Sequence, residues 1–407
     1  WKNPMIAVFL APVYLLFQYY VLSWGFAWTS SLSPMLDSVW FRIPAAAVYL
    51  LLAFSPLFGL LVTREPFHHA FKAIGNFWLG LFLYILLLVL AFDGLRRAAG
   101  LFSLSGFWNI RYHSMLPALP KKLAVCGGLI SLSILGTGIY GFFHGRKVTV
   151  RHDPVVIHKK CAYSNLTVAL LADLHLGSNS NNKSLKKLVA SVNREQPDLI
   201  CIAGDLFDNE YSSISHPETA AEILSQLNSR LGVYACWGNH DVNEKILAGF
   251  TFPSKELRQR EARFERFLKD ANITLLEDEV RLIGGAFYLG GRRDPDMAKK
   301  EHVSRLSAGQ LLSSLDHELP ILLMDHQPKR LSEAQEAGVD LLLSGHTHNG
   351  QMFPANLIVR LFWENPWGIR KKGTMTSAVT SGAGVWGPAM RIGTDSEVMI
   401  LHITFDK

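Results

Sequence analysis

Long apolar runs without a charged residue dominate the first 145 residues. A membrane-spanning helix needs ~20 consecutive apolar residues, and the uncharged stretch Asn3–Leu36 has room for one such span, at about Met5–Gly25. Further runs of this length are Ile43–Val62, Ala73–Phe92 and Leu123–Phe143. A buried core helix is the alternative for a single run, but several in succession favour the membrane, and a cleavable signal peptide is too short to contain them. We therefore predict a domain of four transmembrane helices over residues 1–145.

An even number of spans places Trp1 and the C-terminal part of the chain on the same side of the membrane. Cytoplasmic loops of membrane proteins are enriched in Lys and Arg. The loop Asp93–Lys122 and the segments on the opposite side carry similar numbers of these residues, so the charges do not identify the side. The first residue is Trp1 rather than Met, and we expect the natural N-terminus to lie upstream.

From residue 146 onward, short β-type runs alternate with helical patterns. Helical periodicity appears at Leu185–Arg194 and Glu218–Leu227. The expected strands are Leu166–Ala172, Leu199–Ala203, Val233–Cys236, Ile321–Met324, Leu341–Leu343 and Val398–Ile403. This alternation predicts a layered α/β domain over residues 146–407.

Most of these strands are followed, within a few residues, by side chains that can bind metals. The motifs are Asp173-Leu-His175, Gly204-Asp205-Leu-Phe-Asp208, Gly238-Asn239-His240-Asp241, Asp325-His326 and Gly345-His346-Thr-His348. Ligands of open α/β sheets bind beyond the carboxyl ends of the strands, so we expect these side chains to converge. Each motif alone is common by chance, and Gly-Asn-His-Asp alone also fits a turn followed by a helix cap. Because all five motifs occur in this order, each after an apolar strand, we infer that they form one metal site.

The residue types at this site indicate two divalent cations. Carboxylate, imidazole and amide oxygen together suit Mn²⁺, with Fe or Zn²⁺ as alternatives. The candidate ligands are too many for one ion and divide between two ions that share a carboxylate: Asp173, His175, Asp205, Asn239, His326, His346 and His348. Two ions ~3.5–4 Å apart can clamp a phosphoryl group and activate a bridging hydroxide for in-line attack. The sequence thus predicts a metal-dependent phosphoric ester or diphosphate hydrolase.

Together these motifs resemble those of the calcineurin-like metallophosphoesterases, over about Asn165–Ile403. The segments Gly345–Gln351 and Ser381–Gly384 are similar to the YkuE-like bacterial branch, which includes membrane-bound members. The UDP-diacylglucosamine pyrophosphatases built on the same fold are also similar. The resemblance implies a four-layer αββα sandwich. With the predicted spans, it implies an integral protein of a bacterial inner (plasma) membrane.

The same resemblance implies roles for the residues of the motifs. His240 would act at the substrate phosphate, as proton donor to the leaving oxygen or as a stabiliser of the transition state. Asp241 would orient His240 through a hydrogen bond, and Asp208 would support the ligands from outside. One ion would be held by Asp173, His175, Asp205 and His348, and the other by Asp205, Asn239, His326 and His346.

Two features outside the motifs are candidates for substrate binding. Arg292 and Arg293 follow a strand-like run, and Arg391 lies in an expected loop; guanidinium groups match phosphate oxygens. A solvated pair near a turn is the alternative for the first two. The apolar stretch Leu357–Trp363, followed by Pro366-Trp367, either contacts the bilayer and guides a lipid tail or forms a buried strand and turn.

Composition and the membrane spans narrow the function classes. The net charge is +6, but the basic residues are spread along the chain, which argues against a nucleic-acid partner and suits lipid headgroups. We expect a phosphorylated lipid or lipid-linked substrate held near the bilayer by the anchor. A soluble nucleotide or phosphoprotein is the alternative substrate. A non-catalytic membrane sensor or transporter is disfavoured by the intact ligands and by spans with almost no ionisable residue. The oligomeric state stays open.

Overall fold

The chain folds into two compact units, which are described separately. The computed structural model describes residues 4–62, 64, 66–101, 120–244, 246–247, 250–251 and 262–406. One unit comprises residues 1–141 with 246–253, and the other comprises residues 142–245 with 254–407.

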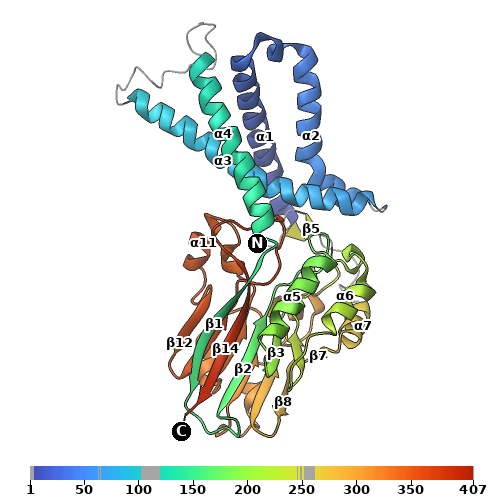
Figure 1. The fold of residues 1–407 in the computed structure, drawn as a ribbon, viewed down its shortest axis with the longest axis vertical. Helices are drawn as coiled ribbons and strands as arrows, with labels where there is room; N and C mark the ends of the chain where they lie inside the picture. The colour runs from blue at the N-terminus through green and yellow to red at the C-terminus, as the bar shows by residue number, and fades with distance from the viewer. Residues whose placement is uncertain are drawn as a thin grey trace. The chain divides into compact units, whose positions relative to one another are not determined.

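The first unit consists of long apolar helices (Figure 1). They are α1 (Pro4–Leu32), α2 (Val39–Leu61), α3 (Phe67–Leu101) and α4 (Pro120–His144), with a short 3₁₀ turn, η1 (Pro34–Asp37), after α1. Among the described residues, four helices are long and apolar enough to cross a membrane, as predicted. Many of their apolar side chains are exposed, including Leu132 and Leu135 on α4, as expected for surfaces that face lipid.

Helix α3 is longer than the predicted span. It runs to Leu101 and includes the start of the predicted loop Asp93–Lys122, while residues 102–119 of that loop lie outside the described residues. Asp93 lies within the helix because it has polar partners there. It accepts a hydrogen bond of 2.7 Å from Tyr20 Oη, and its carboxylate lies 3.8 Å from Arg96 Nε. The two-residue strands β5 (Ile246–Leu247) and β6 (Phe250–Thr251) pair antiparallel and belong to this unit.

The second unit is built on two six-stranded sheets (Figure 1). In spatial order, the first sheet contains β1 (Val148–Ile157), β14 (Ser396–Phe405), β2 (Asn165–Leu171), β3 (Leu199–Ala203), β4 (Val233–Cys236) and β7 (Thr274–Leu275). The second contains β12 (Gly368–Lys372), β13 (Met375–Val379), β11 (Leu341–Ser344), β10 (Ile321–Met324), β9 (Phe287–Gly291) and β8 (Glu279–Ile283). Strands β2, β3 and β4 are parallel to one another, as are β9, β10 and β11. Their carboxyl ends therefore meet at one edge of each sheet.

Three apolar layers hold this unit together. Leu170 of β2 and Leu322 of β10 are buried in the layer between the sheets. Outside the first sheet lie α5 (Asn182–Arg194), α6 (Pro217–Leu224) and α7 (Ala262–Asp270), which bury residues such as Leu188 and Phe264. Outside the second sheet lie α9 (Ala308–Leu312) and α10 (Leu331–Glu336). The order helix, sheet, sheet, helix confirms the expected αββα sandwich.

The predicted strands are all present, with small changes at their ends. Strand β14 extends beyond the predicted Val398–Ile403 at both ends, because it pairs along its whole length with β1. The helix predicted at Glu218–Leu227 ends at Leu224. The remaining short elements are η2 (Tyr211–Ser213), α8 (Pro295–Glu301), η3 (His348–Gly350), α11 (Ala355–Ile358) and η4 (Val359–Leu361).

Candidate metal centre

The loops after β2, β3, β10 and β11 bring carboxylates and imidazoles into two groups. In each group the possible ligand atoms lie within 4.8 Å of one another: Asp173, His175 and His348 in the first, and Asp205, His326 and His346 in the second. The Asp205 carboxylate joins the groups, because its Oδ2 is 3.0 Å from His326 Nε2 and 3.9 Å from His175 Nε2. This is the position required of a carboxylate shared by two cations.

The backbone of these loops is strained in a way that aims the side chains inward. Asp173, His175, Asp205, His346 and His348 all have positive φ, between 45° and 71°. Non-glycine residues rarely adopt this conformation, and such strain concentrates at functional sites.

The glycines of the motifs allow the loops to approach the ligands closely. A Cβ on Gly238 would lie 2.2 Å from Asp205 Oδ1, and one on Gly345 would lie 2.5 Å from Asp173 Oδ2. Neither position can hold a side chain unless a ligand moves.

The hydrogen bonding of the site fits a bound cation. His326 Nδ1 lies 2.8 Å from the Ala203 carbonyl oxygen and donates to it, and Nε2 faces Asp205. Such a bond to a ligating imidazole fixes its tautomer. Asn239 is 5% exposed, and its buried Oδ1 accepts no hydrogen bond from the described residues. A buried amide oxygen without a donor is costly unless a cation takes that place, so the donor set fits two metal ions.

The charges around the site favour the ligand forms of Asp205, His346 and His348. Burial alone would raise the pKa of Asp205, but the positive charge of His326 outweighs burial and holds that pKa well below its usual range. Burial, together with the charge of His326, lowers the pKa of His346 well below its usual value. Burial and the charge of His175 do the same for the pKa of His348. Asp205 is therefore anionic and both imidazoles are neutral, the states that bind cations.

His240 lies beside this centre, but its hydrogen-bond partner differs from the expected one. The centroids of the His240 and His175 rings are 5.3 Å apart. His240 Nδ1 lies 2.6 Å from Asn209 Oδ1, and Asn209 is 2% exposed. The Asn209 Nδ2 faces acceptors, the Val242 carbonyl oxygen at 3.3 Å and Glu244 Oε1 at 3.4 Å. The amide oxygen must therefore face the ring, and His240 Nδ1 donates to it.

The prediction that Asp241 orients His240 is wrong. The Asp241 side chain turns away from the His240 ring and accepts hydrogen bonds from the backbone N–H groups of Asp205, Phe207 and Gly238, at 2.7–2.9 Å. It fixes the ligand loops to each other. Sequence reasoning missed Asn209, whose one signal is an Asn directly after the Gly-Asp-Leu-Phe-Asp motif. Asp208 lies on the outer side of His175, with Oδ1 3.7 Å from Nδ1, consistent with a supporting role.

The structure places the three candidate arginines in contacts within the protein. Arg292 is 5% exposed and pairs with Asp325 at 3.0 Å and Glu333 at 2.9 Å. Arg293 pairs with Glu301 at 2.8 Å. A substrate phosphate would have to displace these carboxylates.

Arg391 is fully buried and donates to backbone carbonyl oxygens of His348, Ser381 and Gly384. It holds the loop of the candidate ligand His348 against the loop that follows β13. A role for Arg391 in positioning His348 fits these contacts better than direct substrate binding.

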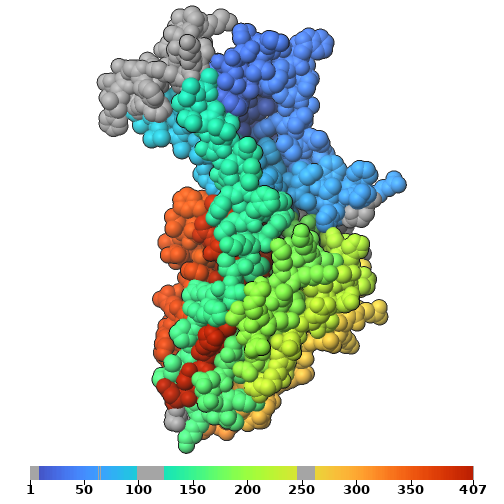
Figure 2. Space-filling view, in the orientation of Figure 1, coloured from blue at the N-terminus to red at the C-terminus, as the bar shows by residue number. Residues whose placement is uncertain are grey.

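The apolar stretch after the last ligand is helical and exposed rather than a buried strand and turn. Its exposed apolar side chains lie on α11, on η4 and on the residues that flank them. We call this surface the apolar ledge; it comprises Phe353, Leu357, Ile358, Leu361 and Phe362, whose exposed fractions range from 48% to 80%. Figure 2 shows the orange segment that contains α11 at the molecular surface. The ledge adjoins the metal centre through Trp363, whose ring centroid lies 5.0 Å from that of His346.

Comparison with known proteins agrees with these motifs. A family model described as Calcineurin-like phosphoesterase matches residues 166–350. A Helicobacter pylori protein named "Uncharacterized metallophosphoesterase" is 31% identical over 278 residues, 67% of this chain and 68% of the relative. A Danio rerio "Transmembrane protein with metallophosphoesterase domain" is 30% identical over 83% of this chain and 74% of its own length. The Bacillus subtilis metallophosphoesterase YkuE is 26% identical over 47% of this chain and 60% of its own length.

Proposed function

Because this chain belongs to the calcineurin-like metallophosphoesterase family, we propose that it hydrolyses a phosphate ester or diphosphate bond in a lipid or lipid-linked substrate. The chain is a metal-dependent phosphoester hydrolase and a membrane protein. The proposal adds the substrate class. We also propose a bacterial inner membrane as its location, which the Helicobacter and Bacillus relatives support.

The observation that carries the proposal is the pair of buried donor groups that meet at Asp205. Two divalent cations at such a site supply positive charge for the phosphoryl oxygens and a water nucleophile of lowered pKa. We propose Mn²⁺, with Fe or Zn²⁺ as alternatives, because the donors are carboxylate, imidazole and amide oxygens. One cation would be held by Asp173, His175, Asp205 and His348, and the other by Asp205, Asn239, His326 and His346.

In this proposal His240 acts on the leaving oxygen or stabilises the transition state. Its Nδ1 is engaged by Asn209, which leaves Nε2 as the ring atom available to the substrate. The His240 backbone N–H donates to Asp205 Oδ1 at 2.8 Å, and this bond holds the residue beside the ligands. Burial lowers the pKa of His240 to about 3, so near neutral pH the free ring carries no proton on Nε2. In this proposal Nε2 takes up a proton when the anionic substrate binds beside it, and then gives that proton to the leaving group.

The apolar ledge supports a lipid substrate. Large exposed apolar patches on a protein mark membrane or partner contacts, and this one lies on a helical segment that ends beside the ligand His346. A hollow next to the ledge is lined by Arg360 and Trp363, among others. Apolar side chains flanked by a basic residue suit a surface of acyl chains and anionic headgroups.

Phosphate release by the full chain in lipid nanodiscs with Mn²⁺ tests this proposal. The substrates are a long-chain lipid phosphate in the bilayer, p-nitrophenyl phosphate and a nucleotide. We expect the lipid phosphate to give the highest kcat/KM. Activity confined to the two water-soluble esters would contradict the lipid substrate while leaving the hydrolase intact.

A further inference from the structure

We propose that a pocket beside the metal centre is a second anion-binding subsite. It would take a charged group next to the scissile phosphate of a substrate whose remainder is apolar. This inference rests on the proposed function and names the substrate class more narrowly, as a lipid-linked diphosphate. We call the subsite the Arg146 pocket.

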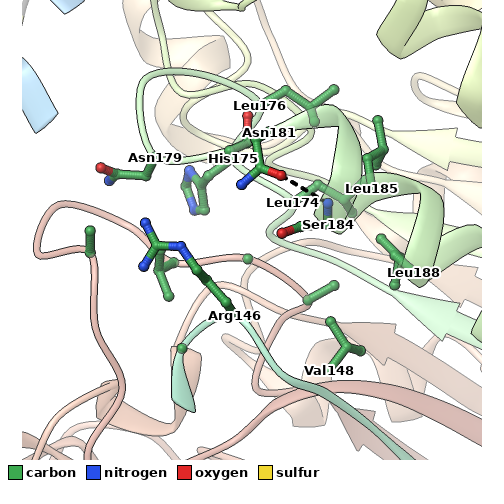
Figure 3. Close-up of a pocket in the computed structure, with 16 residues that line it drawn as sticks. Arg146, Val148, Leu174, His175, Leu176, Asn179, Asn181, Ser184, Leu185 and Leu188 are labelled. Carbon is green, nitrogen blue, oxygen red and sulfur yellow. Dashed lines mark hydrogen bonds between the residues drawn. The ribbon is translucent and has the colours of Figure 1, made fainter. Parts of the chain in front are cut away.

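The lining of the Arg146 pocket connects it to the metal centre and divides it into two halves. The pocket shares His175 with the centre. Figure 3 shows Arg146, His175 and Asn179 at one end and Val148, Leu185 and Leu188 at the other. The 16 lining residues, all of them described, include no Asp or Glu. The pocket therefore offers positive charge at its polar end and hydrocarbon at its apolar end.

Arg146 is held in place but is not neutralised. Its Nη1 donates to the Phe142 carbonyl oxygen at 2.9 Å, and its guanidinium carbon lies 3.5 Å from the centroid of the Phe142 ring. These contacts fix the side chain so that the guanidinium points toward His175 and Asn179 (Figure 3). Within the described part of the chain, no carboxylate forms an ion pair with it. Burial lowers its pKa, but an arginine remains charged at neutral pH.

A half-buried cation without a counter-ion is costly, and a ligand anion removes this cost. Guanidinium groups bind phosphate through paired, charge-assisted hydrogen bonds. The metal centre takes the scissile phosphate, and Arg146 is then placed to take the next anionic group along the substrate. The cavity volume is about 60 Å³, so its apolar end suits the first carbons of the hydrocarbon that follows, while the rest of the chain would extend beyond the pocket. This pattern describes a diphosphate with an apolar substituent rather than a simple monophosphate.

Kinetics of the full chain with Mn²⁺ on dodecyl diphosphate and dodecyl phosphate test the inference. We expect Arg146→Ala to raise KM for the diphosphate by roughly 10- to 100-fold, the loss typical of one charge-assisted bond. KM and kcat for the monophosphate should stay unchanged, and Arg146→Lys should restore part of the difference. The matched control is Lys147→Ala, which removes the neighbouring exposed cation. This variant should change KM and kcat for neither substrate. An equal loss on both substrates would overturn the inference.

A binding measurement separates this inference from the proposed function. Methylenebisphosphonate and its dodecyl derivative cannot be hydrolysed at the bridging carbon, and calorimetry gives their Kd on the full chain. We expect Arg146→Ala to weaken both by roughly 10-fold or more, and the wild type to bind the dodecyl compound more tightly. Unchanged bisphosphonate binding in Arg146→Ala would refute the subsite. Failure of the proposed function would appear instead as no hydrolysis of either dodecyl substrate by the wild type.

Discussion

Asp205 contacts both halves of the candidate metal centre through one side chain. Its Oδ2 faces His326 and His175, and its Oδ1 accepts the His240 backbone N–H. Replacement of Asp205 by Asn removes a charge from both cation positions while it preserves the shape of the side chain.

We expect Asp205→Asn to abolish phosphate release and to lower metal content. The loss of affinity should exceed the roughly 10- to 100-fold that follows when a ligand loses only its hydrogen-bond partner. Metal analysis after dialysis, together with phosphate release, measures both effects. The control is Asp270→Asn, at an exposed site on α7. Full metal content in Asp205→Asn would show that Asp205 is not a shared ligand.

His240→Ala should remove most turnover, by roughly 10²- to 10⁴-fold, and leave metal content unchanged. The ring acts on the substrate and is not among the proposed ligands. Metal analysis and phosphate release with alkyl phosphate measure the two effects separately. Loss of metal in His240→Ala would instead make the residue a ligand.

Asn209→Ala should lower kcat by roughly 10- to 100-fold, because it frees the His240 ring. If Asn209 acts through His240, the double variant Asn209→Ala/His240→Ala should be no slower than His240→Ala alone. The deficit should also be smaller for p-nitrophenyl phosphate, whose leaving group needs little protonation, than for an alkyl phosphate. Additive losses in the double variant would assign Asn209 a separate role.

At this scale the sequence predicted that the candidate ligands converge, but not which residues contact them. Each candidate ligand lies in the loop that follows an apolar strand, so the sheet brings these loops together whatever their local conformation. The partner of His240 depends on the loop backbone, in which Asn209 has φ 63° and Asp241 turns toward backbone N–H groups. The contacts of Arg292 were also hidden, because its partners Asp325 and Glu333 are distant in sequence, just after β10 and on α10.

At the scale of elements, strands of continuous apolar sequence were readable, whereas the edge strands and the buried β13, which contains Thr376 and Ser377, were not. Leu199–Ala203 and Ile321–Met324 are apolar throughout and fully buried, so their patterns stand out. Strand β12 carries Arg370, Lys371 and Lys372 at a sheet edge, and β1 contains charges and Pro154. Such strands form because a neighbour offers backbone partners, which local sequence does not show.

Gly238 connects β4 to the ligands, and we expect Gly238→Ala to lower both thermal stability and metal content. The added Cβ would lie 2.2 Å from Asp205 Oδ1, and overpacking of this kind costs about 1–3 kcal/mol. Thermal unfolding of the full chain with and without Mn²⁺ measures the effect. The control is Gly309→Ala in α9, where an added Cβ meets no atom within 4 Å, so stability should hold or rise. Equal thermal stability and metal content in both variants would contradict the close approach of Gly238 to Asp205.

The apolar ledge gives a second prediction for an element. The double variant Leu361→Asp/Phe362→Asp should lower turnover of a bilayer lipid phosphate by about 10-fold or more, because charged side chains resist entry into lipid. Turnover of p-nitrophenyl phosphate should stay close to wild type. The control is Leu282→Asp on β8, an exposed apolar residue outside the ledge. The same loss on both substrates would mean that the ledge supports folding rather than lipid contact.

At the scale of the whole molecule, one chain combines membrane helices with a hydrolase domain whose site we propose to hold two cations. The change from uncharged runs to an α/β pattern near residue 146 made both parts visible in the sequence. The hairpin β5–β6, which lies within the C-terminal sequence, nevertheless belongs to the helical unit. Its short strands give no pattern that distinguishes them from a loop, so long-range grouping of this kind was beyond prediction.

The most direct measurement is a Mn²⁺ titration of the chelator-treated full chain in nanodiscs, with bound metal and phosphate release recorded together. We expect no hydrolysis without metal, saturation at two ions per chain, and full activity only when the second ion binds. Saturation at one ion, or hydrolysis that persists in the metal-free protein, would contradict the two-cation centre at Asp205.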